Sequence, residues 1–246
     1  RESNCMKTVY YHPWWQWPQA DGPDRINPDP LDNPLFMENT FIPPTTYLQY
    51  LKDQNMWEGW DHEKCPALGH FADNTFVFYS QNNLDYRLNE EDDIELFMDK
   101  ERNRVFDLTL GSRHTVLEND NMVLQFYPRY LLWTKHKEAW VELIPVPNGP
   151  MAQLPATFPL GKWSRSVHAT PISKRNQRVT MKRGDAQFMI RFPDRGEKYQ
   201  LKMKRPSEKE MLEQEQHHQL KKYLPHISWS IMTKKEEKKC PFRKFW

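Results

Sequence analysis

Apolar and polar residues alternate with a period of two through the middle of the chain, from about residue 74 to 204. Phe106, Leu108 and Leu110 show the pattern in one run, and Phe188 and Ile190 show it in another. A period of two places alternate side chains on opposite faces of a strand. The runs recur at short intervals and are bounded by Asn, Asp, Gly and Pro, so they favour an antiparallel β-sandwich or barrel.

We therefore predict a mainly β protein, with an antiparallel, jelly-roll-like β-sandwich over residues 60–205. The expected strands cover 75–80, 84–88, 94–98, 104–110, 113–118, 122–127, 129–135, 139–145, 155–160, 164–170, 177–182, 186–192 and 198–203.

Residues 1–59 are rich in proline and aromatic residues but have no periodicity. Repeated prolines remove amide donors, so we expect neither a long helix nor a central strand between residues 10 and 60. A short helix at about 45–56, capped by Thr45 or Thr46, is the exception. The segment is interpreted as an extended arm that packs over the main domain or docks on another subunit.

Residues 206–246 are predicted to form a helix followed by a basic tail. Ser207 and Glu210 make a capping box, and the helix is expected to run to about Tyr223 before Pro225. Residues 202–246 contain 12 Lys and Arg against 6 Glu, whereas residues 1–60 contain 4 against 8 acidic residues. Oppositely charged ends suit head-to-tail docking between chains, and two solvated termini are the alternative.

Composition excludes several classes of function. The chain has only 8 Gly in 246 residues and contains no glycine-rich phosphate loop. Its formal net charge of +2 argues against a surface built wholly for nucleic acid. No CxxC pair occurs among the three cysteines, and an odd number favours a reducing compartment. We find no signal peptide and no apolar run that would span a membrane.

Candidate sites for chemistry are sparse. The Arg183-Gly184-Asp185 string resembles an adhesion motif but is predicted to be a hairpin turn. A metal site needs converging His and carboxylate ligands. The candidates are His70, His114, His168 and Asp73, while residues 61–73 are otherwise expected to be a surface loop. Catalysis by Cys65 and by the acidic run 90–93 has no supporting pattern.

The aromatic residues at the two ends are the candidate interaction residues, and those of the tail seat either in a partner or back on the sandwich of the same chain. They are Trp14, Trp15 and Trp17 near the start, and Phe242, Phe245 and Trp246 at the end. The aromatic and lysine residues of the tail also give a weaker case for binding single-stranded nucleic acid. Glu236 and Glu237 within the tail count against it.

Three segments, in order, resemble a family of uncharacterised proteins from tailed phages of marine cyanobacteria, distantly similar to a bacterial DUF6065-like family. The first segment consists of Lys64-Cys65-Pro66-Ala67 and residues 74–80. The second covers residues 154–165 and begins Leu154-Pro155-Ala156-Thr157, and the third covers residues 182–192 and begins Lys182-Arg183-Gly184-Asp185. Ser164 and Ala186 depart from the family pattern. The resemblance spans residues 60–205 and implies a viral origin, in the host cytoplasm or virion, and a compact β-domain, but no activity.

The function expected from these features is protein–protein contact, virion-associated or host-directed, by a phage protein without evident catalysis. A protein partner or self-association is expected, and no cofactor. The alternative is a cupin-like or Fe(II)-dioxygenase-like enzyme on the same sandwich, with iron or another divalent metal held by the histidines named above.

Overall fold

The prediction of a mainly β, antiparallel sandwich is confirmed in a computed structural model of the chain. The structure describes residues 6–14, 41–56, 65–91, 93–97, 110–117, 121–126, 129–149, 151–162, 165–194, 196–213 and 216. The described strands form four sheets that pack around one large core. Phe78 lies at its centre, with its ring stacked on Phe188 at 4.8 Å and edge-on to Tyr130 at 4.6 Å.

Two sheets carry the candidate site described below. One has the order β12 (Arg165–Val167), β8 (Arg129–Thr134), β1 (Lys7–Trp14) and β16 (Tyr199–Met203). The other has the order β11 (Ala156–Phe158), β9 (Val141–Ile144), β15 (Ala186–Arg191), β3 (Thr75–Tyr79) and β2 (Thr45–Thr46). β16 and β2 are therefore edge strands, and β16 runs parallel to β1.

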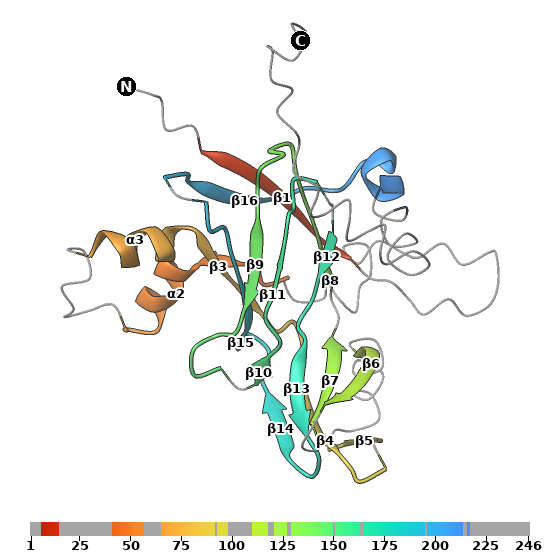
Figure 1. Cartoon of the computed structure of the whole chain (residues 1–246). Coiled ribbons are helices and arrows are strands. Elements are labelled where there is room, and N and C mark those ends of the chain that lie inside the picture. The colour runs from red at the N-terminus through yellow and green to blue at the C-terminus, as the bar shows by residue number, and fades with distance from the viewer. Residues whose placement is uncertain are drawn as a thin grey trace, which may run out of the picture.

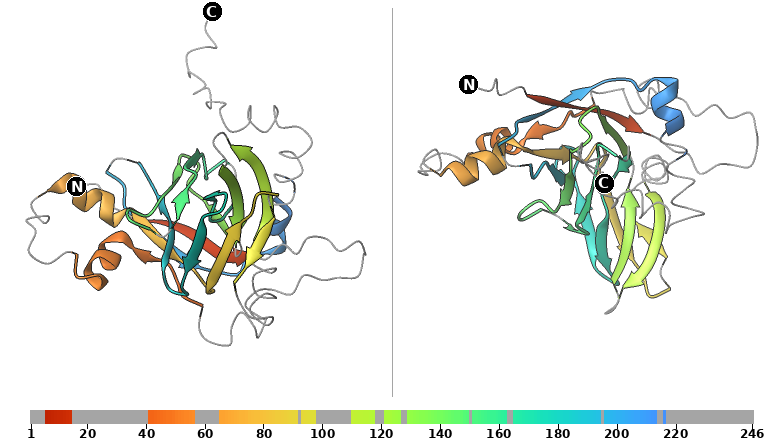
Figure 2. Two further views of the ribbon diagram at one scale, coloured as in Figure 1. Left: turned by 90° about the horizontal axis from the view of Figure 1, so that it is seen from below. Right: turned by 45° about the horizontal axis from the view of Figure 1, so that its top comes forward.

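The two remaining sheets lie at the far end of the molecule from β1 and β16 (Figure 1). One contains β10 (Ala152–Gln153), β13 (Pro171–Lys174), β7 (Asn121–Phe126) and β6 (Leu110–Leu117). The other contains β14 (Arg178–Met181), β4 (Leu84–Leu88) and β5 (Ile94–Leu96). The right-hand view of Figure 2 shows the same separation.

The N-terminal segment contains a central strand, so the expectation that none runs between residues 10 and 60 is wrong. β1 lies between β8 and β16. Lys7 N–H donates to Lys198 O at 2.7 Å, and Tyr11 O accepts from Lys204 N–H at 3.0 Å. Odd-numbered peptide groups of β1 therefore face β16. Pro13 is also odd-numbered and lies beyond the last pair, Tyr11 with Met203, so its missing N–H breaks no ladder bond.

Helix α2 (Tyr47–Asp53) confirms the predicted short helix, with Thr46 Oγ1 accepting from Gln49 N–H at 3.2 Å. α3 (Pro66–Asp73) corrects the predicted surface loop. Pro66 occupies the first turn of α3, where a missing N–H costs no helical hydrogen bond. Both helices lie on the same side of the sheets (Figure 2).

The predicted capping box is present at the start of the C-terminal helical segment, 208–213. Ser207 N–H donates to Glu210 Oε2 at 2.7 Å, and Glu210 N–H donates to Ser207 Oγ at 3.3 Å. The predicted end at Tyr223 lies outside the described residues. The division into 1–59, 60–205 and 206–246 stays a prediction, although β1 of the first segment is built into a sheet of the second.

The Arg183-Gly184-Asp185 string forms the predicted turn between β14 and β15. Gly184 has a φ of 91°, and Asp185 Oδ2 accepts from Lys182 N–H at 2.7 Å. Arg183 N–H is held in turn by Asn83 Oδ1 at 2.9 Å. The backbone geometry of a β-turn accounts for this string.

Candidate functional site

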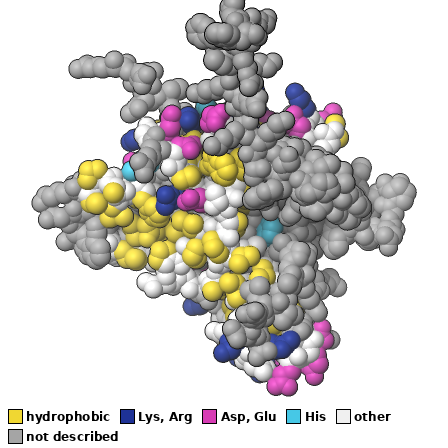
Figure 3. Space-filling model, viewed as in Figure 1, with side chains coloured by type: hydrophobic (Ala, Val, Ile, Leu, Met, Phe, Trp, Pro, Cys, Tyr) yellow, Lys and Arg dark blue, Asp and Glu magenta, His cyan; other side chains and the backbone are white. Residues whose placement is uncertain are grey.

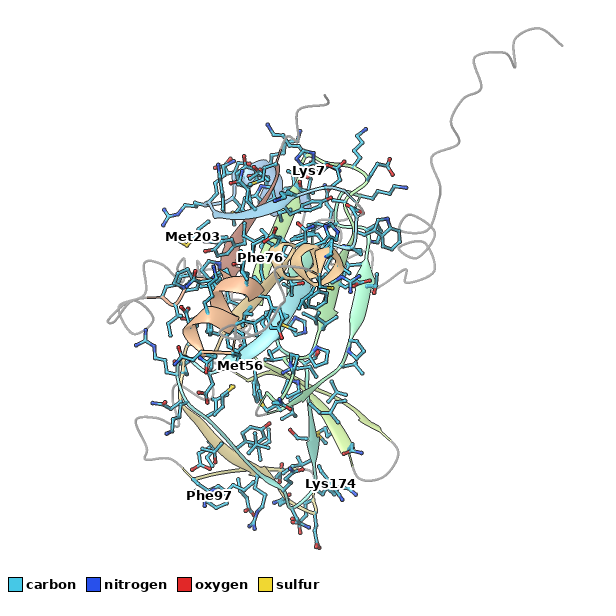
Figure 4. All side chains as sticks on the ribbon, turned by 90° about the vertical axis from the view of Figure 1, so that its left-hand side faces the viewer. Lys7, Met56, Phe76, Phe97, Lys174 and Met203 are labelled. Carbon is cyan, nitrogen blue, oxygen red and sulfur yellow. The ribbon has the colours of Figure 1, made fainter. Side chains whose placement is uncertain are left out.

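A groove of about 380 Å³ separates the edge strand β16 from β2 and β3 of the neighbouring sheet. It is lined by Met6, Pro44, Thr46, Asp73, Phe76, Lys198, Tyr199, Gln200 and Leu201. In Figure 4 Lys7, Phe76 and Met203 lie at this end of the molecule, opposite Phe97 and Lys174. The groove thus runs between edge strands of two different sheets.

The floor of the groove is aromatic and rigid. Tyr199 stacks on Phe192 with ring centroids 4.5 Å apart, and Phe192 meets Phe76 edge-on at 5.9 Å. All three side chains are buried, and Leu201 packs against the same core. Met6 and Met203 remain 49% and 51% exposed. Apolar surface next to the strand edge therefore comes from Met6, Leu201 and Met203, above a buried aromatic layer.

Asn74 fixes the start of β16. Its side chain is buried, with Oδ1 accepting from Tyr199 N–H at 3.0 Å and Nδ2 donating to Glu197 O at 2.8 Å. Its backbone O accepts from Phe192 N–H at 3.0 Å. One side chain at the junction of α3 and β3 thereby joins β16 to the second sheet.

The outer edge of β16 presents peptide groups that have no partner among the described residues. The C=O of Lys198 and the N–H of Lys204 bond to β1. The backbone N–H and C=O groups of even-numbered residues in β16 therefore face β1, and those of odd-numbered residues face outward. Asn74 takes the outward N–H of Tyr199. Within the described part of the chain, the N–H and C=O groups of Leu201 and Met203 bond to nothing. These four groups form a short template for another strand.

Charged side chains gather at the end of the groove where β16 starts. Lys198 lies 3.4 Å from Asp73, and Lys7 lies 3.2 Å from Glu197 and 5.6 Å from the ring centroid of Tyr199. Burial, and then a hydrogen bond to Asp194, raises the pKa of Tyr199 above its usual range. The Tyr199 hydroxyl therefore stays neutral and acts as a fixed donor to Asp194.

A second hollow of about 220 Å³ lies on the other side of Asn74, lined by Ala67, His70, Phe71, Asn74, Arg191, Phe192 and Pro193. The positively charged side chain in this lining, Arg191, already has partners. Arg191 lies 3.4 Å from Glu142 and 5.2 Å from the ring centroid of Phe71. Figure 3 shows the surrounding face, where hydrophobic side chains gather over the side of the molecule that carries α2 and α3.

The structure distributes the candidate metal ligands over three places. His70 and Asp73 lie on α3, His168 lies between β12 and β13, and His114 lies in β6. His70 Nδ1 contacts Asn74 Nδ2 at 3.4 Å, and Asp73 faces Lys198. The described residues contain no group of three or more potential ligands. Cys65 is exposed and unpaired with another cysteine.

One further string has a spacing typical of iron ligands, His136-Lys137-Glu138. It lies in the tight turn between β8 and β9, where His136 O accepts from Ala139 N–H at 3.1 Å. Lys137 and Glu138 are exposed there. The turn presents these side chains to solvent, away from any converging partner among the described residues.

The aromatic residues predicted for interaction lie outside what the structure describes. Trp14 ends β1, but its side chain is not described, nor are Trp15, Trp17, Phe242, Phe245 and Trp246. Of the residues that line the groove, only Asp73 was a candidate site residue, and it was predicted as a metal ligand. No alternation pattern distinguishes an edge strand from its neighbour, so the free edge of β16 carried no sequence signal.

No protein-family model, curated protein or solved structure matches this chain. No helix in the described ranges is both long and apolar enough to cross a membrane.

Proposed function

We propose that this protein works by protein–protein contact and accepts an extended segment of a partner at the open edge of β16. The single observation that carries the proposal is the pair of outward peptide units at Leu201 and Met203, which lie beside an apolar groove. Addition of a strand to a sheet edge takes its affinity from main-chain hydrogen bonds and its specificity from pockets for alternate side chains.

The geometry of β16 supports this mode of binding. The strand is held on one side by β1 and at its start by Asn74, so its outward groups are fixed before a partner arrives. A rigid template lowers the entropy cost of association. The groove floor of Phe76, Tyr199 and Leu201 then buries every second side chain of an added strand.

The test is the binding of a labelled, uncharged peptide of about six residues in which valine alternates with threonine. We expect it to bind the full chain, and we expect Met203→Pro to abolish binding, because proline removes an outward N–H that β1 does not use. Met203→Ala keeps the N–H and is expected to retain binding.

Methylation of the peptide nitrogens supplies the complementary control. Methyl groups on the amides that face β16 are expected to prevent binding, whereas methyl groups on the alternate amides are not. Binding that survives both Met203→Pro and methylation of either set, or no binding by any extended peptide, would contradict the proposal.

A further inference from the structure

Resting on the proposed function, we infer that the accepted strand belongs to another protein and alternates apolar with acidic side chains. The inference depends on the different chemistry of the two faces of β16. Side chains of an added strand lie level with those of β16 and alternate between the same two faces.

The inner face of β16 is apolar. Tyr199 is buried, Leu201 packs against the core, and Met203 is 51% exposed at the end of the strand. Phe76 and Met6 extend this surface across the groove. Every second residue of the added strand therefore meets an apolar floor, and burial of an apolar side chain there is favourable.

The outer face of β16 is basic. Gln200, Lys202 and Lys204 point to it, and Gln200 Nε2 donates to Thr8 Oγ1 at 2.9 Å. Lys204 lies 3.8 Å from Glu210 and 5.0 Å from the ring centroid of Tyr10. Lys202 is exposed and has no ion-pair partner among the described residues. The alternate residues of an added strand therefore lie beside an unpaired cation.

The positive charge of Lys202 also favours a strand of another protein over a second copy of β16. A second copy of β16 would place its own lysines opposite Lys202, and like charges opposite each other on paired strands are destabilising. Edge lysines are a common means of preventing such self-pairing. An acidic side chain at the same position gains an ion pair, so the edge favours a partner strand of opposite charge.

The test compares three peptides of about six residues, in which valine alternates with glutamate, threonine or lysine. We expect the glutamate peptide to bind up to roughly fivefold more tightly than the threonine peptide, and the lysine peptide to bind most weakly. The preference is expected to shrink as salt is added.

Lys202→Glu is expected to weaken binding of the glutamate peptide by roughly fivefold and to leave the threonine peptide unchanged. Lys174→Glu, an exposed lysine at the opposite end of the molecule (Figure 4), is the matched control and is expected to change neither. Equal affinity for all three peptides, or dimerisation of the protein through this edge, would overturn the inference. Either result would still be consistent with the proposed strand-binding function. No binding of any peptide would instead remove the function itself.

Discussion

At the scale of single residues, Asn74 is the side chain on which the groove depends most. It supplies both an acceptor for Tyr199 N–H and a donor for Glu197 O, and it is buried. We expect Asn74→Ala to lower the free energy of unfolding by about 2 kcal/mol, because two backbone groups lose their partner. Urea denaturation measures this, with exposed Gln177→Ala as control. A loss no larger than that of the control would contradict the role given to Asn74.

Gly161 is the second residue whose identity follows from its surroundings. A Cβ at this position would lie 2.1 Å from His136 O and 2.4 Å from Lys137 C, which are backbone atoms of the turn between β8 and β9. We expect Gly161→Ala to cost about 2 kcal/mol or more of stability, since the turn must move. Its control is Gly69→Ala in α3, where a Cβ meets nothing within 4 Å.

The Gly69→Ala variant is expected to stabilise the protein by about 0.5–1 kcal/mol, the ordinary gain of alanine over glycine inside a helix. Thermal unfolding of both variants gives opposite signs if the two positions are as described. Destabilisation by Gly69→Ala would contradict the open position of that residue on α3.

At the scale of elements, strands with one buried face were predictable because alternation records burial directly. β4 was predicted at its observed bounds, and its burial alternates along Leu84–Leu88. β1 was not predicted, because whether Pro13 is tolerated depends on where β16 ends, which is a property of residues far along the chain. α3 was missed because Pro66 and Gly69 indicate a loop unless the first-turn position of Pro66 is known.

The candidate site was less predictable than the fold. The strand 198–203 was expected, and β16 covers Tyr199–Met203, but its place at a sheet edge depends on the order of strands. The groove adds β2 and Pro44 from a different sheet and from the loop before it. Local patterns do not carry such long-range pairings, so sequence reasoning favoured the aromatic ends instead.

The pairing of β14 with β4 has an electrostatic component with a defined pH dependence. Arg178 donates to both oxygens of Asp85 at 2.7 Å, and these hydrogen bonds hold the pKa of Asp85 below its usual range. A carboxyl with a lowered folded-state pKa stabilises the fold fully above its unfolded pKa of about 3.9. This contribution is lost as the pH falls from that value through the lower folded-state pKa.

We therefore expect the wild type to lose stability more steeply than Asp85→Asn below about pH 4. Chemical denaturation at a series of acidic pH values measures the two slopes. Parallel slopes for the two proteins would show that the Arg178 contact contributes nothing to the pH dependence.

At the scale of the whole molecule, buried tyrosines link the sheets, and we expect them to set the alkaline limit of stability. Burial raises the pKa of Tyr11 to about 12, and burial also raises the pKa values of Tyr86 and Tyr130. Tyr86 additionally shares a hydrogen bond of 2.7 Å with Ser173. A raised folded-state pKa contributes stability that is complete below the unfolded value of about 10 and is lost as pH rises above it.

The protein is accordingly expected to unfold as pH rises from about 10 through 12, with tyrosine ionisation and loss of β circular dichroism in one transition. Tyr11→Phe should make the loss of stability above pH 10 less steep. Tyrosines that ionise fully while the β signal persists would contradict their burial.

The proposed function assigns the contact surface to one end of the sandwich. The far sheets, β10-β13-β7-β6 and β14-β4-β5, lie away from the groove, whereas β1 and β16 carry the proposed contact surface. The central claim is that the outer edge of β16 is open in the free protein and becomes paired when a strand binds.

Amide hydrogen exchange at Leu201, Lys202 and Met203, with and without the valine–glutamate peptide, tests that claim most directly. Lys202 N–H faces β1 and is expected to be protected in both states. The amides of Leu201 and Met203 are expected to exchange rapidly in the free protein and at least roughly tenfold more slowly in the complex. Rapid exchange at both residues in a saturated complex, or protection already present without peptide, would contradict the account.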